Sequence, residues 1–131
     1  MKTAIVYATT TGNTEQLANA AKETAGTDAY FSTADVADSA EVLSADLILL
    51  GSPAMGAEQL EDSMEAFFSS IEGQLSGKKV VLFGSYDWGG GQFIDDWAER
   101  VSAAGAEVTG CVKAQLAPDE NALSEIKSLI K

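Results

Sequence analysis

The sequence predicts an α/β three-layer sandwich, in which a five-stranded parallel sheet carries helices on both faces. Two observations support this prediction. Apolar runs rich in β-branched residues alternate with helical patterns along the whole chain. The strongest runs are continuous rather than alternating in polarity, as expected for strands that are covered on both faces. We expect residues 1–131 to form one domain, because no linker, repeat or low-complexity tract interrupts the pattern.

The strands are predicted in order of the chain. The runs TAIVYA, DLILLGS and KVVLFGS, at 3–8, 46–52 and 79–85, are the strongest strands, and AYFS near Ala29 and EVTGCVKA near Glu107 are weaker ones. Helical patterns occupy the intervals, with a short helix or turn near Ala40; the longer ones cover 14–25, 60–72, 92–104 and 120–130. Phe93 and Trp97 are spaced to meet inside a helix. We expect both in the core, together with Tyr7, Phe31, Phe67 and Cys111.

The charge of the chain is strongly negative. Twenty acidic residues against eight basic ones give a net charge of −12 and a pI near 4.1. Such a surface repels the phosphates of nucleic acid and of anionic membranes, so neither is an expected partner. A basic protein partner, attracted over long range, fits better.

The composition also limits the chemistry. The chain has no histidine and a single cysteine, Cys111, which argues against a disulfide framework and a cysteine-based metal site, and we expect no metal. The N-terminal apolar run is too short for a signal peptide, and no segment reaches the roughly 20 apolar residues of a membrane span. The expected location is the cytoplasm.

The loop TTTGNT, at 9–14, follows the first strand and precedes a helix. A helix N-terminus offers unpaired N–H groups to an anion, and hydroxyl and amide side chains add further donors. The absence of lysine argues against an ATP-binding P-loop, so the predicted ligand is a phosphate monoester held by neutral groups. The alternative is a helix cap with no ligand.

Two more loops follow the other strong strands, and all three are expected at the carboxyl edge of the sheet. The loop GSPAMGAEQLEDS places Met55 at a turn, and GSYDWGGGQF places Tyr86 and Trp88 on a glycine-rich segment. Exposed aromatic side chains there favour a flat ligand, although Trp88 could instead cover a gap between helices. Together the loops predict a phosphorylated aromatic ligand.

These three motifs, in this order and spacing, resemble the short-chain flavodoxins over the whole length of the sequence: IVYATTTGNTE, LLGSPAMGAEQLEDS and LFGSYDWGGGQFIDDW. The resemblance implies a flavodoxin-like fold with strand order 2-1-3-4-5, as known for that family. It implies non-covalent FMN as cofactor and a low-potential one-electron carrier that substitutes for ferredoxin, not an enzyme. The implied partners are ferredoxin- or flavodoxin-dependent reductases and oxidoreductases, and the implied state is a monomer.

The resemblance also assigns roles to residues. The phosphate is expected on Thr9, Thr10, Thr11, Gly12, Asn13 and Thr14, with a hydroxyl from Ser52. Met55 and Trp88 are expected on opposite faces of the flavin and Glu58 at its N3–H. The rest of the site is expected along the flavin's other edges: Pro53, Ala54, Gly56, Ala57, Ser85, Tyr86, Asp87 and Gly89.

In this family the peptide after Gly56 turns over when the flavin N5 takes a proton. Glycine tolerates both turn states, and nearby acids disfavour the anionic reduced flavin. The resemblance therefore implies a stabilised semiquinone. Ala57 and Asp87 depart from the family pattern. We expect Ala57→Gly to stabilise the semiquinone and Asp87→Asn to raise the second potential, both measurable by redox titration.

The acids near this edge form an expected docking ring for basic redox enzymes: Glu58, Glu61, Asp62, Glu65, Asp87, Asp95 and Asp96. The alternative is a solvated acidic rim. Two other functions were compared. A receiver domain would need an aspartate after the third strand, where this chain has LLGS. An FMN-dependent NAD(P)H or quinone reductase would need a substrate pocket over the flavin, for which Met55 and Trp88 leave little room.

Overall fold

The structure, a computed structural model, describes residues 2–10, 12–55, 59–86 and 90–130. Five parallel strands form one sheet in the order β2-β1-β3-β4-β5, which confirms the predicted fold class and strand order. The strands are β1 (Thr3–Tyr7), β2 (Tyr30–Thr33), β3 (Leu47–Gly51), β4 (Lys79–Tyr86) and β5 (Glu107–Gln115). The helices are α1 (Asn13–Ala25), α2 (Ser39–Leu43), α3 (Asp62–Ile71), α4 (Gln92–Ala103) and α5 (Glu120–Ser128), with single 3₁₀ turns η1 (Ala34–Val36) and η2 (Glu72–Gln74).

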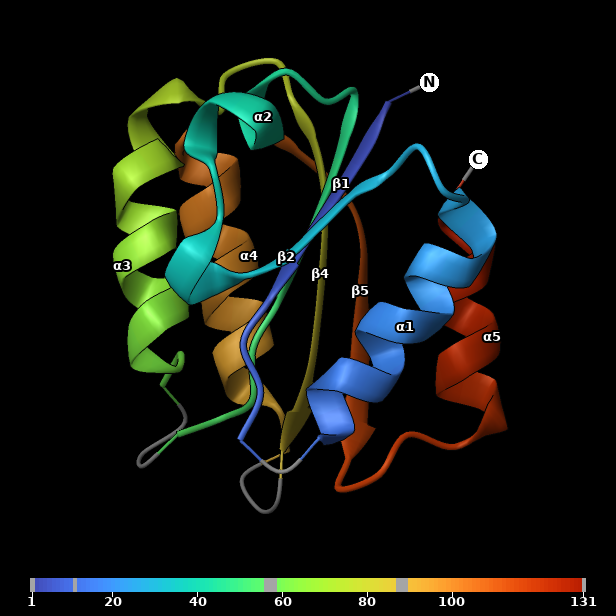
Figure 1. Cartoon of the computed structure of the whole chain (residues 1–131). Coiled ribbons are helices and arrows are strands. Elements are labelled where there is room, and N and C mark those ends of the chain that lie inside the picture. Colours follow the sequence, from blue (N-terminus) through green and yellow to red (C-terminus); the bar gives the residue numbers. More distant parts are fainter. Residues whose placement is uncertain (1, 11, 56–58, 87–89, 131) are drawn as a thin grey trace.

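The helices cover both faces of the sheet, as Figure 1 shows. Helices α1 and α5 lie on one face, where Leu17 and Ile126 are buried against the strands. Helices α2, α3 and α4 lie on the other, where Phe68 and Trp97 meet edge to face with their ring centroids 5.8 Å apart. The two apolar layers follow from the continuous apolar strands, which present side chains to both faces.

The central strands are fully buried, whereas the edge strands are not. All five residues of β1 and all five of β3 are buried, but β2 is half-buried throughout. The expected core positions of Tyr7, Phe67, Phe93 and Trp97 are correct. The expectation for Phe31 and Cys111 was wrong, since both are only half-buried. They lie on the edge strands β2 and β5, where a neighbouring strand covers one side only.

The topology brings three loops to one edge of the sheet. The chain leaves β1 toward β2 on one side, while β3 and β4 lie on the other. The loops after β1, β3 and β4 therefore emerge at the same carboxyl edge, the lower end of Figure 1. Within the part of the chain that the structure describes, every helix is too short or too polar to cross a bilayer.

Candidate functional site

A cavity of about 210 Å³ opens at this carboxyl edge, between the three predicted loops. It is lined by Thr10, Asn13, Pro53, Ala54, Ser85, Tyr86 and Leu116. Six of these seven residues were predicted from the sequence as site residues. The structure therefore brings together residues from the loops after β1, β3 and β4, which are up to 76 positions apart in the chain (from Thr10 to Tyr86).

The first loop ends in an uncapped helix. Gly12 precedes α1 with a φ of 90°, and no side chain of the described residues caps the helix there. The hydroxyl of Thr9 instead accepts a hydrogen bond of 3.0 Å from the Gly12 N–H, which closes the loop on itself. The first N–H groups of a helix have no acceptor within it, so those of α1 stay available for an anion. This donor set, without a cation, fits a phosphate monoester.

A buried hydroxyl pair joins the first loop to the third. The Thr14 Oγ1 and Ser85 Oγ atoms lie 3.0 Å apart, and both side chains are buried. Each hydroxyl has one proton, and their mutual hydrogen bond uses only one of the two. Because Ser85 lines the cavity, its proton can be donated to an acceptor there when Thr14 donates to Ser85. The pair therefore adds a neutral donor to the site.

The described residues of the second loop are joined by hydrogen bonds within the loop. The hydroxyl of Ser52 donates to the Pro53 carbonyl and accepts from the Glu61 N–H, both over 2.9 Å. Met55 and Gln59 exchange two backbone hydrogen bonds of 2.8 Å, which hold these two residues side by side in an antiparallel bridge. Ser52 is fully buried and its hydroxyl is used within the loop, so its observed partners give it a role in shaping the loop. The side chain of Met55 is 38% exposed.

The third loop packs directly on the second. A Cβ on Gly84 would lie 2.2 Å from the Ser52 carbonyl oxygen, so only glycine allows this approach. The carbonyl of Tyr86 accepts a hydrogen bond of 2.7 Å from the N–H of Leu116, which brings the loop after β5 to the cavity. The predicted residues Thr11, Gly56, Ala57, Glu58, Asp87, Trp88 and Gly89 lie outside the described residues.

Leu116 is a cavity residue that the sequence analysis missed. Its φ of 59° makes it the only non-glycine residue in the left-handed region within the described part of the chain. Its side chain is 51% exposed although it is apolar. A leucine in this conformation is strained. Because its side chain is exposed, the burial of apolar surface does little to offset that strain. Both features are typical of a residue at a ligand-binding site. The local sequence did not predict them, because leucine is not a residue type that favours a positive φ.

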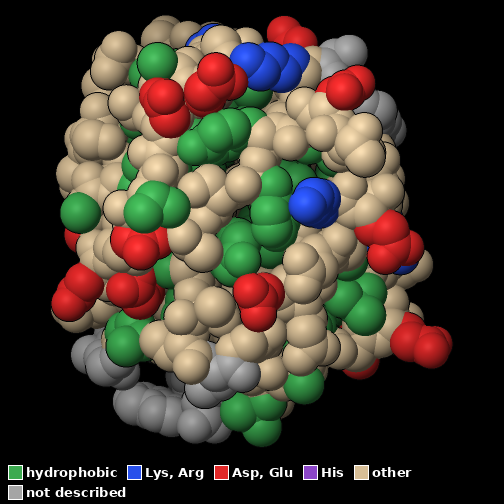
Figure 2. Space-filling model, in the orientation of Figure 1, with side chains coloured by type: hydrophobic (Ala, Val, Ile, Leu, Met, Phe, Trp, Pro, Cys, Tyr) green, Lys and Arg blue, Asp and Glu red, His purple; other side chains and the backbone are tan. Residues whose placement is uncertain are grey.

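The acidic residues near the site are not equivalent. Glu61 caps α3 by accepting from the Ser63 N–H, and Asp95 forms a 2.9 Å ion pair with Lys113. Glu65 pairs with Arg100, whose hydrogen bonds lower the pKa of the Glu65 carboxyl despite its partial burial. Asp62 and Asp96 have no ion-pair partner among the described residues. Figure 2 shows acidic side chains on the side of the molecule where α3 lies and also on the opposite side, where α1 and α5 lie.

Comparisons with known proteins agree with this geometry. The family model described as "Flavodoxin" matches residues 5–128. The chain is 47% identical to a flavodoxin of Megasphaera elsdenii over 119 residues, which cover 88% of this chain and 87% of that one. A flavodoxin of Clostridium beijerinckii is 44% identical over 108 residues, covering 79% and 78% of the two chains.

A solved structure is similar over nearly the whole chain. The solution structure of two-electron reduced Megasphaera elsdenii flavodoxin superposes with a TM-score of 0.89 at 41% identity, covering 98% of this chain and 97% of the other. A flavodoxin of Streptococcus pneumonia gives a TM-score of 0.87 at 26% identity, covering 99% and 95%.

Proposed function

The chain belongs to the flavodoxin family, and on that premise we propose which of its residues hold the cofactor and receive its partners. Members of this family are electron-transfer proteins rather than enzymes, and they bind FMN non-covalently. The predicted cofactor, the predicted carrier function and the transfer of electrons to redox partners are thereby confirmed. Nothing in the comparisons favours the alternative of an NAD(P)H or quinone reductase.

The cofactor phosphate is assigned to the start of α1. The neutral donors at this position are the unpaired backbone N–H groups beside Gly12, the hydroxyls of Thr10 and Thr14, and the amide of Asn13. Thr9 contributes by holding the loop closed, and Ser85 adds its hydroxyl through Thr14. The single observation that supports this assignment best is the uncapped helix start that faces a cavity with a buried hydroxyl pair.

The flavin ring is assigned to the space between the second and third loops. Pro53, Ala54 and Tyr86 line that side of the cavity, and the exposed Met55 follows Ala54 in the chain. FMN supplies the one-electron chemistry when it is bound, while the protein orients it and excludes water. We propose that Leu116 closes the cavity from the side of β5. The contributions of Thr11, Gly56, Ala57, Glu58, Asp87, Trp88 and Gly89 stay predictions.

We further propose that the acidic rim docks basic redox enzymes. The support is the net charge of −12 and the carboxylates of Asp62 and Asp96, which have no ion-pair partner within the described part of the chain. Electron transfer to a basic partner should slow as ionic strength rises, and a rate independent of salt would contradict the docking role. The monomeric state and the cytoplasmic location also remain predictions.

Stepwise anaerobic reduction of the FMN-reconstituted protein tests the proposed function. We expect the visible absorption spectrum to show a distinct long-wavelength band once one electron per flavin has been added. Bleaching directly to the two-electron level would favour the reductase alternative. A protein that FMN cannot reconstitute would contradict the assigned site.

A further inference from the structure

The first turn of α1 already contains a carboxylate, that of Glu15, beside the position assigned to the phosphate. Glu15 is the third residue of the helix, and its side chain is half-buried. A glutamate at this position commonly folds back and accepts a hydrogen bond at the helix start, in the arrangement called a capping box. Such a carboxylate would occupy donors that the phosphate needs and would repel the phosphate. An anion can therefore bind here only if the Glu15 carboxylate is held elsewhere.

Tyr7, the last residue of β1, holds this carboxylate. Its hydroxyl donates a hydrogen bond of 3.0 Å to Glu15 Oε2. The Tyr7 side chain is buried, and its ring lies against that of Phe31 on β2, with the two centroids 5.3 Å apart. Burial raises the pKa of the Tyr7 hydroxyl above its usual value, and the hydrogen bond and charge of Glu15 raise it further. The phenol therefore stays protonated at neutral pH and remains a donor.

The other bond of a capping box is blocked as well. In that motif the glutamate accepts from the N–H of the residue before the helix, which here is Gly12. The Gly12 N–H instead donates to the Thr9 hydroxyl over 3.0 Å. Thr9 thus takes the donor of the motif, and Tyr7 takes its acceptor. Two separate contacts, both made by residues that precede α1, keep Glu15 from capping its own helix.

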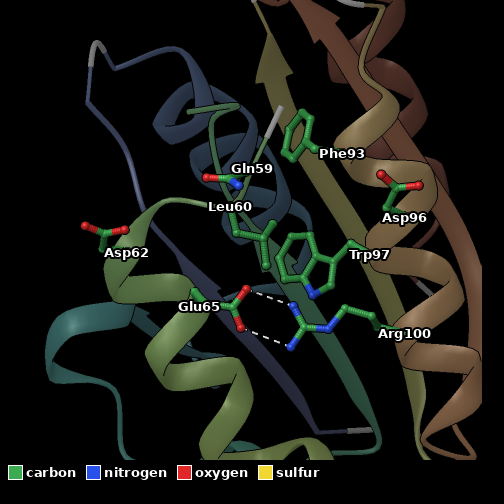
Figure 3. Close-up of a pocket in the computed structure, with 8 residues that line it drawn as sticks. All are labelled: Gln59, Leu60, Asp62, Glu65, Phe93, Asp96, Trp97 and Arg100. Atoms are coloured by element: carbon green, nitrogen blue, oxygen red, sulfur yellow. Dashed lines mark hydrogen bonds and ion pairs between the residues drawn. The ribbon is translucent and has the colours of Figure 1, made fainter. Parts of the chain in front are cut away.

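Other glutamates near this edge of the sheet show the alternatives. Glu61 accepts from the Ser63 N–H and so caps α3. Glu65 is held by Arg100, whose guanidinium donates two hydrogen bonds of 2.8 and 3.0 Å to it (Figure 3). Glu15 has no ion-pair partner among the described residues, and the hydroxyl that holds it is uncharged. Removing one oxygen atom from Tyr7 would therefore release the Glu15 carboxylate.

We propose that Tyr7 is a positioning residue for the cofactor: it holds the Glu15 carboxylate away from the first turn of α1 and so keeps the N–H groups there open to the FMN phosphate. The described residues that line the cavity beside this turn carry no charge, so they could not neutralise a second anion. This inference rests on the proposed phosphate site, since it names what keeps that site free.

A hydrogen bond that only stabilised the fold would have a different effect. Its loss would weaken the binding of FMN and of riboflavin alike, because both ligands need the same folded apoprotein. Release of the Glu15 carboxylate would act on the phosphate, which riboflavin lacks. The ratio of the FMN and riboflavin affinities therefore distinguishes a positioning role of Tyr7 from a structural one.

Flavin fluorescence titration of the apoprotein at low salt tests the proposal. Tyr7→Phe removes only the hydroxyl and leaves the ring beside Phe31. It should weaken FMN binding about threefold to tenfold, as expected for a charge released at a helix start, and riboflavin binding less than about twofold. Glu15→Ala removes the carboxylate, so the double variant Tyr7→Phe/Glu15→Ala should recover the wild-type ratio. Tyr30→Phe is the matched control, because its hydroxyl accepts from the Asp38 N–H over 2.7 Å, and it should leave the ratio unchanged.

Nuclear magnetic resonance of the ¹⁵N-labelled apoprotein follows the released carboxylate. In Tyr7→Phe the backbone N–H proton signals of Asn13 and Thr14 should move downfield, because the carboxylate then accepts from the first turn of α1. The same removal of the hydroxyl from Glu15→Ala should not move them. An unchanged affinity ratio in Tyr7→Phe, a loss that persists without Glu15, an equal loss in Tyr30→Phe, or unmoved signals would each overturn the proposal.

The affinity ratio of the wild-type apoprotein separates this inference from the proposed function. If the wild-type protein binds FMN no more tightly than riboflavin, the phosphate site fails and this inference fails with it. If the wild-type protein prefers FMN and Tyr7→Phe keeps the whole preference, the phosphate site stands and the positioning role of Tyr7 is wrong.

Discussion

Helices α1 and α3 both begin at the carboxyl edge of the sheet, yet their first turns are built in opposite ways. Helix α3 begins after Glu61, whose carboxylate accepts from the Ser63 N–H over 3.1 and 3.0 Å. Helix α1 begins after Gly12, which has no side chain, and within the described part of the chain no other side chain caps it. The positive end of α3 is thus satisfied inside the protein, whereas that of α1 is left for an outside anion.

The other helices make the same distinction clearer. Asp38 and Asp119 cap α2 and α5 with their carboxylates, as Glu61 does for α3. Helix α4 also follows a left-handed glycine, Gly91, but there a Cβ would lie 2.9 Å from the Lys113 side chain. At Gly12 no atom of the described residues lies within 4 Å of such a Cβ. Glycine at position 12 therefore leaves the helix end open toward free space, which is what a bound phosphate needs.

The largest predicted effect comes from giving α1 a carboxylate of its own. Gly12→Asp should weaken FMN binding about 100-fold, because the new charge both occupies the open N–H groups and repels the phosphate. Gly26→Asp is the matched control: it adds the same charge at the other end of α1, where φ is also 90° and the space is also open. Flavin fluorescence titration measures both affinities. Equal losses of FMN affinity in the two variants would contradict the assignment of the phosphate to the start of α1.

Removing the buried hydroxyl of Thr14 should be the next largest effect. Thr14→Val leaves the Ser85 hydroxyl without its 3.0 Å partner, which should lower the free energy of unfolding by about 2 kcal/mol. FMN binding should weaken as well, since the Ser85 proton is no longer directed into the cavity. Thr14→Ser keeps the hydroxyl and should retain most of both. Urea unfolding of the apoprotein separates the stability effect from the binding effect.

Leu116 shares the left-handed backbone of Gly12 but carries a side chain. Leu116→Asn should raise the stability of the apoprotein by about 1 kcal/mol, because asparagine tolerates this region better than leucine. FMN should dissociate faster from the same variant, because the apolar wall on the β5 side is lost. Thermal unfolding and stopped-flow release of the flavin check the two parts. A slower release would show that Leu116 does not close the cavity.

Loss of the α3 cap should affect stability alone. Glu61→Ala should lower the free energy of unfolding by about 1 kcal/mol, as expected for a helix cap, and should change the FMN dissociation constant less than threefold. Asp119→Ala removes the cap of α5, which makes a comparable bond of 2.9 Å to the Ala122 N–H, and should cost a similar amount. A large loss of FMN affinity in Glu61→Ala only would show that α3 contributes to the anion site.

The smallest effect concerns the ion pair of Glu65. Hydrogen bonds from Arg100 lower the pKa of the Glu65 carboxyl in the folded protein. The ion pair therefore stabilises the fold at pH values above the pKa of Glu65 in the unfolded chain. This stability is lost as the pH falls through the lower pKa of Glu65 in the folded protein. Glu65→Gln should therefore cost less than about 1 kcal/mol at pH 7, since the pair is partly exposed, and nothing well below pH 4. Glu107→Gln serves as the control. Urea unfolding as a function of pH measures the difference.

Much of the fold and part of the site were predictable from the sequence, for physical reasons. Short continuous apolar runs favour strands covered on both faces, and the central strands were correctly placed. The three loops meet because parallel strands end at one edge. The position of Phe31 and Cys111 at sheet edges was not predictable from their own segments, because burial there depends on which strand has no outer neighbour.

Other features depend on contacts between residues distant in sequence. The hydroxyl of Ser52, for which the family resemblance implied a phosphate contact, accepts a hydrogen bond from the Glu61 N–H nine residues away, and the segment around Ser52 does not predict this bond. Leu116 reaches the cavity through a bond to Tyr86 thirty residues earlier. The double pairing of Arg100 with Glu65 and Glu72 follows from how α3 packs on α4.

The affinity of the apoprotein for FMN compared with riboflavin tests the central claim most directly. The two ligands differ only in the phosphate, so their ratio isolates the contribution of the open α1 start and its hydroxyls. Titration followed by flavin fluorescence should show FMN binding at least about 100-fold more tightly, or about 2.7 kcal/mol. Equal affinities would mean that the neutral loop at 9–14 does not hold a phosphate, and would contradict the account.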